Sequence, residues 1–284
     1  MICVAAGLFL GLSAGGFLSA AEAPKGAVLH FDFNKEDPAG NIPDGSGQNN
    51  SGKATGAKWT GSAKKGGGYE LNPTNSCIRI AHSPSLTLKQ GTFSTWFKVT
   101  RSDANCRRIL NRGKDGAFSM TVGGEPDDSN AQGKVTIRFG DRQIIAGDKN
   151  VADGLWHNAA VVFDGKDLKL FVDGELQKKA VPCTGNDVPG SGDFTIGMFR
   201  PGGPADPGTQ SLEGAVDEVM VFNRALAQDE IKALVYSVDP NPGKARFTKQ
   251  QVAGRLRQLK LLYEEGLLTQ EFYDEKVREC ETSQ

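Results

Sequence analysis

The sequence lacks an excess of charge of either sign. Its 33 basic and 34 acidic residues leave a formal net charge of −1 over 284 residues, and the two signs are interspersed. Nucleic acid and anionic membrane surfaces are bound by concentrated basic faces, so neither is expected as a partner. With 38% hydrophobic residues and 36 glycines, the chain can form one large all-β domain rich in tight turns, with a small appendage.

Cysteine and histidine are also scarce, with five and three residues. No Cys-x-x-Cys pair and no Cys/His pair at ligand spacing occurs, which argues against zinc and thiol redox chemistry. Without Cys3, four cysteines remain, and in an exported chain they allow three disulfide connectivities that spacing alone does not separate. They are Cys77, Cys106, Cys183 and Cys280. Because Cys280 lies in a separate C-terminal segment, a Cys106–Cys183 bridge within the main domain is favoured.

The N-terminal segment, residues 2–21, is apolar and carries no charge before Glu22. It ends in Ser19-Ala20-Ala21, and small residues at these positions suit signal-peptidase cleavage after Ala21. We therefore expect a signal peptide over residues 1–21, a secreted or periplasmic location and no membrane attachment after cleavage. The alternative is an uncleaved anchor, although glycine- and alanine-rich stretches span bilayers poorly.

Residues 27–222 alternate short apolar-polar stretches with turn residues, which predicts an all-β sandwich or barrel. Asp164-Gly165 and Asp173-Gly174 supply the positive φ angles of tight hairpins. No run of helices separates the strands, so a parallel α/β sheet is excluded. The expected strands are Val28–Phe33, Cys77–Ala81, Thr92–Thr100, Arg108–Asn111, Phe118–Val122, Lys134–Phe139, His157–Phe163, Leu168–Val172, Phe194–Met198 and Ala215–Phe222.

The C-terminal part changes character. A short helix is expected over Gln228–Tyr236, and Asp239-Pro240-Asn241-Pro242-Gly243 then interrupts the chain. We place the sandwich at residues 24–237, a Pro/Gly linker at 238–247 and a two-helix segment at 248–284. Thr248 with Gln251 predicts the first helix start, Gly266 ends that helix, and Thr269 begins the next. A hairpin of this size buries little apolar surface by itself. We therefore expect it to pack on a partner protein, on a second copy of the chain or on the sandwich.

Several ordered motifs resemble the laminin-G-like, concanavalin A-like lectin/glucanase family. They are Phe31-Asp32-Phe33, the loop Asp44–Gly52, His82–Leu86, Phe93–Phe97, Asp153–Gly165 with Leu168–Gly174, and Gly214–Leu226. The resemblance covers about residues 27–236 and implies a two-sheet antiparallel jelly-roll sandwich. It does not specify a ligand, because this fold hosts many functions. One departure is Ala227, which stands where the family has a serine or threonine that caps the terminal helix.

The tail Leu256–Lys276 resembles a SHOCT-type helical hairpin. That resemblance implies an interaction role, including a homo-oligomer formed through the C-terminal helices.

Catalysis is not expected. Glycosidases of this architecture hold their carboxylates on one strand as Glu-x-Asp-x-(x)-Glu, on the same face. Here Glu213 and Glu218 are five residues apart and point to opposite faces, while Glu125 belongs to a loop rich in glycine, proline and asparagine. The three histidines, His30, His82 and His157, have no Gly-x-Ser-x-Gly motif or cysteine partner.

The family resemblance implies a structural calcium ion. In this fold calcium often joins the first and last strands through an aspartate of the closing Val-Asp-Glu-Val strand and through backbone carbonyls. By position, Asp217 would supply its carboxylate, with carbonyls from Asp32 and Gly68. The alternative is that Asp217 only makes local hydrogen bonds.

A binding role remains as the main hypothesis, with a glycan or a surface protein as partner. Sugar binding needs an exposed aromatic side chain with nearby polar groups. Trp96 lies on the opposite face from Phe93 and Phe97 and is the candidate for the concave sheet. In the two long loops the candidates are Asp127, Asp128, Asn130 and Arg200. A scaffolding protein that oligomerises through its helices is the second hypothesis, and a glycoside hydrolase, disfavoured by the missing carboxylate pair, is the third.

Overall fold

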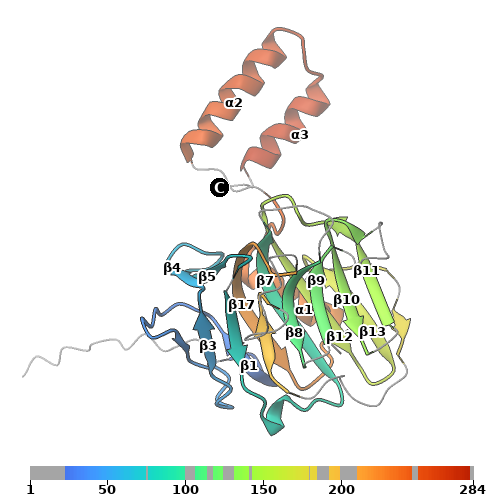
Figure 1. Ribbon diagram of the computed structural model, residues 1–284. Helices are drawn as coiled ribbons and strands as arrows, with labels where there is room; N and C mark the ends of the chain where they lie inside the picture. The colour runs from blue at the N-terminus through green and yellow to red at the C-terminus, as the bar shows by residue number, and fades with distance from the viewer. Residues whose placement is uncertain are drawn as a thin grey trace, which may run out of the picture.

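The computed structural model describes residues 23–74, 76–99, 106–113, 118–123, 131–140, 143–178, 180–183, 192–198, 210–244 and 249–281. Within these residues the chain forms two antiparallel β-sheets that pack face to face, followed by three α-helices (Figure 1). The expected two-sheet sandwich is therefore confirmed.

The first sheet, sheet A, contains nine of the described strands. Its order is β14-β13-β12-β7-β17-β5-β4, with β1 paired to β17 and β15 paired to β13. The strands are β1 (Ala27–Phe31), β4 (Lys58–Thr60), β5 (Gly68–Leu71), β7 (Gly91–Val99), β12 (Trp156–Phe163), β13 (Asp167–Val172), β14 (Glu175–Leu176), β15 (Val181–Pro182) and β17 (Gly214–Phe222).

The second sheet, sheet B, contains eight of the described strands in the order β11-β10-β9-β8-β16-β6-β3-β2. They are β2 (Asn41–Ile42), β3 (Gly52–Thr55), β6 (Cys77–Ile80), β8 (Arg107–Arg112), β9 (Phe118–Val122), β10 (Lys134–Phe139), β11 (Gln143–Asn150) and β16 (Phe194–Ile196). A single 3₁₀ turn, η1 (Pro84–Leu86), leads towards β7.

Every predicted strand is present, with ends that differ by two residues at most. The seven that the sequence did not predict are short or interrupted by glycine and charged residues: β2, β3, β4, β5, β11, β14 and β15.

Aromatic side chains from both sheets form the centre of the core. Phe93 of sheet A stacks on Phe118 of sheet B with ring centroids 4.4 Å apart, and Phe139 lies 4.7 Å from Phe163. The residues that alternate inward on β12 and β13, such as Val161 and Leu170, belong to this core as predicted. Since successive strand residues point to opposite faces, the residues between them define the outer face of each sheet.

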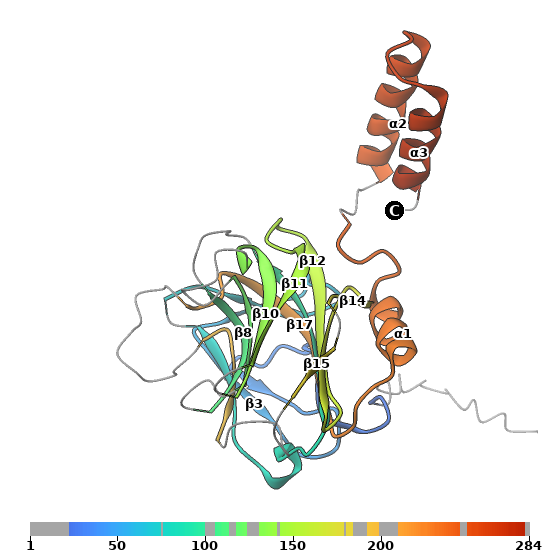
Figure 2. The ribbon, with the colours of Figure 1, turned by 90° about the vertical axis from the view of Figure 1, so that its right-hand side faces the viewer.

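The outer face of sheet A is covered by helix α1 (Gln228–Val238) (Figure 2). Ile231 and Val235 pack with Trp96, Met220 and Phe222 in a second, smaller apolar cluster. The helix begins at Ala227, which has no side-chain cap.

Helices α2 (Lys249–Glu264) and α3 (Gln270–Glu281) lie side by side outside the two sheets (Figures 1 and 2). Gly266, with φ +73°, ends α2 as predicted, since the Leu267 amide donates to the Leu262 carbonyl at 2.9 Å. Thr269 starts α3 by accepting the Phe272 N–H at 3.3 Å. Thr248, the expected cap of α2, lies outside the described residues.

The cysteines do not form the expected disulfide. All four that the structure describes, Cys77, Cys106, Cys183 and Cys280, are thiols. Cys106 precedes β8 in sheet B, whereas Cys183 follows β15 in sheet A. Burial raises the pKa of the Cys77 and Cys183 thiols, so both are protonated at neutral pH. None of the helices in the described ranges is long and apolar enough to cross a bilayer.

Candidate functional site

The outer face of sheet B is polar, in contrast to the helix-covered face of sheet A. On β9, Phe118 and Met120 point into the core, so Ser119 and Thr121 point outward. On β10, Val135 and Ile137 are core residues, so Thr136 and Arg138 point outward.

Strand pairing places the outward side chains in two rows. In the first row, Thr195 lies opposite both Arg79 and Asn111, and Ser119 lies opposite both Asn111 and Arg138. The row crosses five strands, so at about 4.8 Å per strand it extends over roughly 19 Å. In the second row, Thr121 lies opposite both Arg108 and Thr136. We call these eight residues the polar face: Arg79, Arg108, Asn111, Ser119, Thr121, Thr136, Arg138 and Thr195.

Two hydroxyl groups of the polar face are buried without a hydrogen-bond partner. The Ser119 and Thr136 side chains are 1% and 2% exposed, and neither hydroxyl oxygen is hydrogen-bonded. By contrast, the Thr195 hydroxyl donates to the Met198 carbonyl at 2.7 Å. Buried polar groups are nearly always hydrogen-bonded, so these two hydroxyls mark a place suited to a ligand or water atom.

The cationic groups of the polar face are held in place by neighbouring oxygen atoms. Arg79 forms an ion pair with Asp193, whose carboxylate also accepts the His82 N–H at 2.9 Å. Burial raises the pKa of Asp193, but the hydrogen bond from the His82 amide and the charge of Arg79 together lower it by more, so the net shift of the pKa is downward. Arg108 donates to the Gln210 side chain at 3.1 Å, and Arg138 donates to the Gly140 carbonyl at 3.4 Å.

The predicted loop residues Asp127, Asp128, Asn130 and Arg200 lie outside the described residues. The ends of their loops are nevertheless placed. Residues 124–130 join β9 to Ala131 before β10, and residues 199–209 join Met198 to Gln210. The Gln210 carbonyl accepts the Arg108 N–H at 3.0 Å. Both loops therefore start and end beside strands that carry the polar face.

Trp96 is not an exposed platform. It points away from the main core, as predicted, but α1 covers that face and leaves the ring 1% exposed. The Lys64 ammonium lies 4.5 Å from its ring centroid. Trp59 and Trp156 are half-buried, and the Trp59 indole donates to the Phe33 carbonyl at 2.8 Å. A ring as buried as Trp96 cannot stack on a sugar.

The three residues expected at a calcium site are close in the fold. A Cβ built on Gly68 would lie 3.7 Å from the Asp217 Cβ, and Phe31, just before Asp32, pairs with Val219. Asp217 is fully buried and accepts backbone N–H groups from Lys65 at 2.8 Å and Glu218 at 2.7 Å. Burial, helped by the Glu218 charge, raises the pKa of Asp217 to about 7.

This environment fits a bound cation. Asp217 forms no ion pair within the described residues, and a buried carboxylate beside a second one is stabilised by a positive charge. No group of three or more His, Cys, Asp or Glu side chains gathers there in the described part of the chain. Calcium would therefore depend on backbone carbonyls, such as those of Asp32 and Gly68, in addition to the Asp217 carboxylate.

The other ionisable groups have structural contacts. Glu218 lies 3.5 Å from His30 and 3.6 Å from Lys65, whereas Glu213 precedes β17 and is not part of the strand. The His157 ring is fully buried between Asp173, at 2.7 Å, and Asp153, at 3.1 Å. Within the described residues, no strand carries a carboxylate pair of the glycosidase type.

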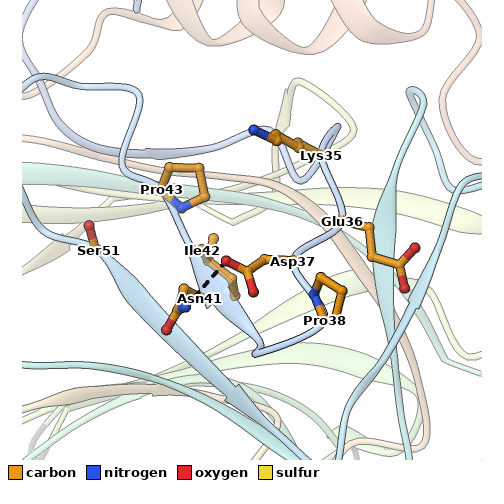
Figure 3. Close-up of a pocket in the computed structure, with 8 residues that line it drawn as sticks. All are labelled: Lys35, Glu36, Asp37, Pro38, Asn41, Ile42, Pro43 and Ser51. Atoms are coloured by element: carbon orange, nitrogen blue, oxygen red, sulfur yellow. Dashed lines mark hydrogen bonds between the residues drawn. The ribbon is translucent and has the colours of Figure 1, made fainter.

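A surface pocket of about 540 Å³ lies between the loop Lys35–Pro38 and β2 (Figure 3). It is lined by two carboxylates, Glu36 and Asp37, and Asp37 accepts the Ala39 N–H at 2.7 Å and the Asn41 side-chain amide at 3.2 Å. The Ala39 amide is the main reason that the pKa of Asp37 lies below its usual value. The hydrogen bonds of Asp37 therefore stabilise the local turn.

The two antiparallel sheets, one covered by a helix and the other bearing a polar outer face, define a lectin-like jelly-roll sandwich. The family described as the concanavalin A-like lectin/glucanases superfamily (Laminin_G_3) matches residues 72–232, more than half of the chain. The chain belongs to this family. The match ends before α2, so the SHOCT resemblance of the C-terminal hairpin stays a prediction.

Solved structures agree on the fold. The binding domain of Paraclostridial Mosquitocidal Protein 1 aligns with a TM-score of 0.58 at 17% identity, over 75% of this chain and 52% of that one. Domain 4 of AbnA, an extracellular arabinanase from Geobacillus stearothermophilus determined in complex with arabinotriose, aligns with a TM-score of 0.56 at 19% identity, over 74% of this chain and 98% of that one. The binding domain of botulinum neurotoxin serotype G aligns with a TM-score of 0.56 at 14% identity, over 74% of this chain and 51% of that one.

The chain thus spans about half the length of the toxin domains that it matches. At these identities the likeness shows the fold alone. No curated protein matches the sequence.

The sequence interpretation missed the polar face. The available signal was the alternation on β9 and β10, where every second residue is Ser, Thr or Arg although both strands are largely buried. A solvated outer face produces the same alternation, so only burial and strand order distinguish a binding face.

Proposed function

We propose that the chain is an exported, non-catalytic binding module that recognises a carbohydrate or a cell-surface molecule through the polar face of sheet B. The observation that carries this proposal is the pair of buried hydroxyls, Ser119 and Thr136, on that face. The likeness to toxin binding domains and to an arabinanase domain bound to arabinotriose supports the class of partner.

A glycan array probed with the full chain and its Thr136→Val variant tests the proposal. The substitution keeps the shape and removes a hydroxyl that has no protein partner, so it leaves the fold intact. We expect binding that Thr136→Val weakens and that Thr60→Val, on β4 of sheet A, leaves unchanged. Equal binding by all three proteins, or hydrolysis of a bound glucan, would overturn it.

We also propose a structural calcium ion at Asp217, with carbonyls of Asp32 and Gly68. When bound, it would compensate the buried charge and join the first and last strands of sheet A. The support is the buried carboxylate without an ion pair in the described structure.

Self-association through the C-terminal hairpin is a second candidate function. Leu261 on α2, Leu267 in the connection and Phe272 on α3 are 54%, 66% and 44% exposed. Large apolar side chains gathered on a small hairpin favour a second copy as the partner. Light scattering should give a multimer that Leu267→Ser with Phe272→Ser dissociates, whereas Leu176→Ser on β14 does not. A monomeric full chain would contradict it.

A further inference from the structure

The pocket beside β2 lies at the edge of sheet B. The strand order of that sheet ends at β2, so no further strand of the described structure covers this edge. Of the residues that line the pocket, only Ile42 is buried, so a ligand can enter from solvent. The volume of about 540 Å³ falls within the range of about 300–1,000 Å³ that is usual for small-molecule sites.

A network of hydrogen bonds fixes the polar groups at the centre of the pocket (Figure 3). Asp37 accepts the Ala39 N–H at 2.7 Å through one carboxylate oxygen and the Asn41 amide at 3.2 Å through the other. Lys53, opposite Asn41 on β3, donates to Asn41 Oδ1 at 3.1 Å. Carboxylate lone pairs and the second N–H of the Asn41 amide remain for a ligand. Because the network already orders these side chains, binding costs them little further conformational entropy.

Groups of both charges surround this centre without being used by the protein. In the described structure Lys35 and Glu36 form no ion pair, and the exposed Ser51 hydroxyl has no hydrogen-bond partner. The ammonium groups of Lys35 and Lys53 balance the carboxylates of Glu36 and Asp37, so the pocket has no net charge. A ligand hydroxyl both donates and accepts, so it can bond a carboxylate and an ammonium group together. A charged ligand would meet a like charge as well as an opposite one.

Apolar surface lies beside the polar groups. The Pro38 and Pro43 rings and the Ile42 side chain line the pocket. A sugar ring carries C–H groups on its faces and hydroxyls around its edge, so it can contact the prolines while its hydroxyls reach the polar centre. Within the described structure no aromatic side chain lines the pocket. Affinity therefore depends on individually weak hydrogen bonds, and we expect a Kd on the order of 1 mM.

We infer that this pocket binds a neutral sugar residue, with the Asp37 carboxylate and the Asn41 amide bonding adjacent hydroxyl groups. The inference goes beyond the proposed function, because none of the polar-face residues lines the pocket. Each site can therefore fail without the other.

The Ala39 amide reports on the pocket directly, because it donates to the Asp37 carboxylate. The experiment titrates the ¹⁵N-labelled full chain, at low and high salt, and follows its amide NMR signals. The neutral probes are cellotriose, mannotriose, galactotriose and xylotriose, and the charged probes are spermidine and glucuronate. We expect a neutral probe to shift the Ala39 and Ser51 signals saturably and independently of salt. The charged probes should leave both signals in place.

Ser51→Ala removes an exposed hydroxyl that has no partner in the described structure, so it keeps the fold. It should weaken the binding roughly two- to tenfold. Ser62→Ala, an exposed serine between β4 and β5, is the matched control and should leave binding unchanged. Asp37→Asn retains an acceptor for the turn but removes the charge, and it should weaken binding more than Ser51→Ala does. Thermal unfolding shows that each variant is folded.

Shifts caused by spermidine alone, and lost at high salt, would show a cation site and overturn the ligand class. The inference also fails if no neutral probe shifts Ala39, or if Ser51→Ala and Ser62→Ala have equal effects. A neutral probe that shifts the Ser119 and Thr136 amides instead of Ala39 overturns the pocket but supports the proposed function. Saturable Ala39 shifts, together with array binding that Thr136→Val does not change, keep the pocket and overturn the polar face.

Discussion

Gly243 packs directly against the ring of His157: a Cβ built on this glycine would lie only 2.7 Å from His157 Cε1. The same Cβ would lie 2.7 Å from Lys149 Nζ and 2.8 Å from Asp173 Oδ2. Gly243 also has φ +69° and donates its N–H to the Trp156 carbonyl at 3.2 Å. The linker therefore rests on a buried ionic cluster, and only glycine fits there.

Gly243→Ala should detach this part of the linker from the cluster. Three contacts below 3.0 Å and a left-handed backbone both oppose the side chain, so we expect a loss of about 1–3 kcal/mol in the free energy of unfolding. Limited proteolysis should then cut between the sandwich and α2 faster. Gly254→Ala, in α2 with open space around it, should instead be neutral or stabilising. Unchanged cleavage in Gly243→Ala would argue against the docked linker.

Calcium binding should depend on the ionisation of Asp217. Its folded pKa is about 7, above the model-compound value of 3.8, so the folded chain binds the proton more tightly than the unfolded chain. Without metal, this group therefore makes stability fall as pH rises from about 4 to about 7. Calcium binds the ionised form, so it should raise the melting temperature at pH 8 and have little effect at pH 5.5.

Differential scanning calorimetry with calcium, magnesium and chelator at both pH values measures this effect. Asp217→Asn should abolish the response to calcium, whereas Asp32→Asn should retain it because that residue would contribute only its backbone carbonyl. Loss of the response in both variants would contradict the assigned roles, and no response in the parent chain would exclude the site.

The buried Arg112 should weaken the fold. Its side chain is 1% exposed, its Nε and Nη1 atoms have no hydrogen-bond partner, and burial lowers the pKa of its guanidinium. The guanidinium carbon lies 5.0 Å from the Phe194 ring centroid, in a position that an apolar side chain could fill. Arg112→Met should raise the free energy of unfolding by at least about 1 kcal/mol in a urea titration. Arg79→Met, which removes an exposed pair, should change it by less than about 0.5 kcal/mol. A destabilised Arg112→Met would show that the charge is needed.

Local chemistry was enough to predict much of the sandwich. Asp164-Gly165 and Asp173-Gly174 mark hairpins, and the alternation through Val161 and Leu170 identifies the core side of β12 and β13. The burial of Trp96, by contrast, depends on residues far away in the sequence. Its face was predicted correctly, but a helix from much later in the chain covers that face and turns an expected binding ring into core. The first row of the polar face has the same origin, since Arg79, Thr195 and Asn111 meet only through the order β6-β16-β8.

The start of α1 offers a stabilising substitution. Ala227 has the extended backbone of an N-cap, and its N–H donates to Glu230 Oε2 at 2.9 Å, while Arg224 holds Oε1 of the same carboxylate at 2.7 Å. Half of a capping box is thus present, and the missing half is a side-chain acceptor for the Glu230 amide. Ala227→Ser should supply it and raise the free energy of unfolding by about 1 kcal/mol, or the melting temperature by roughly 2–4 °C. Ala227→Gly, which adds no acceptor, should change stability less than serine does. Equal gains from serine and glycine would place the effect in the backbone instead of the cap.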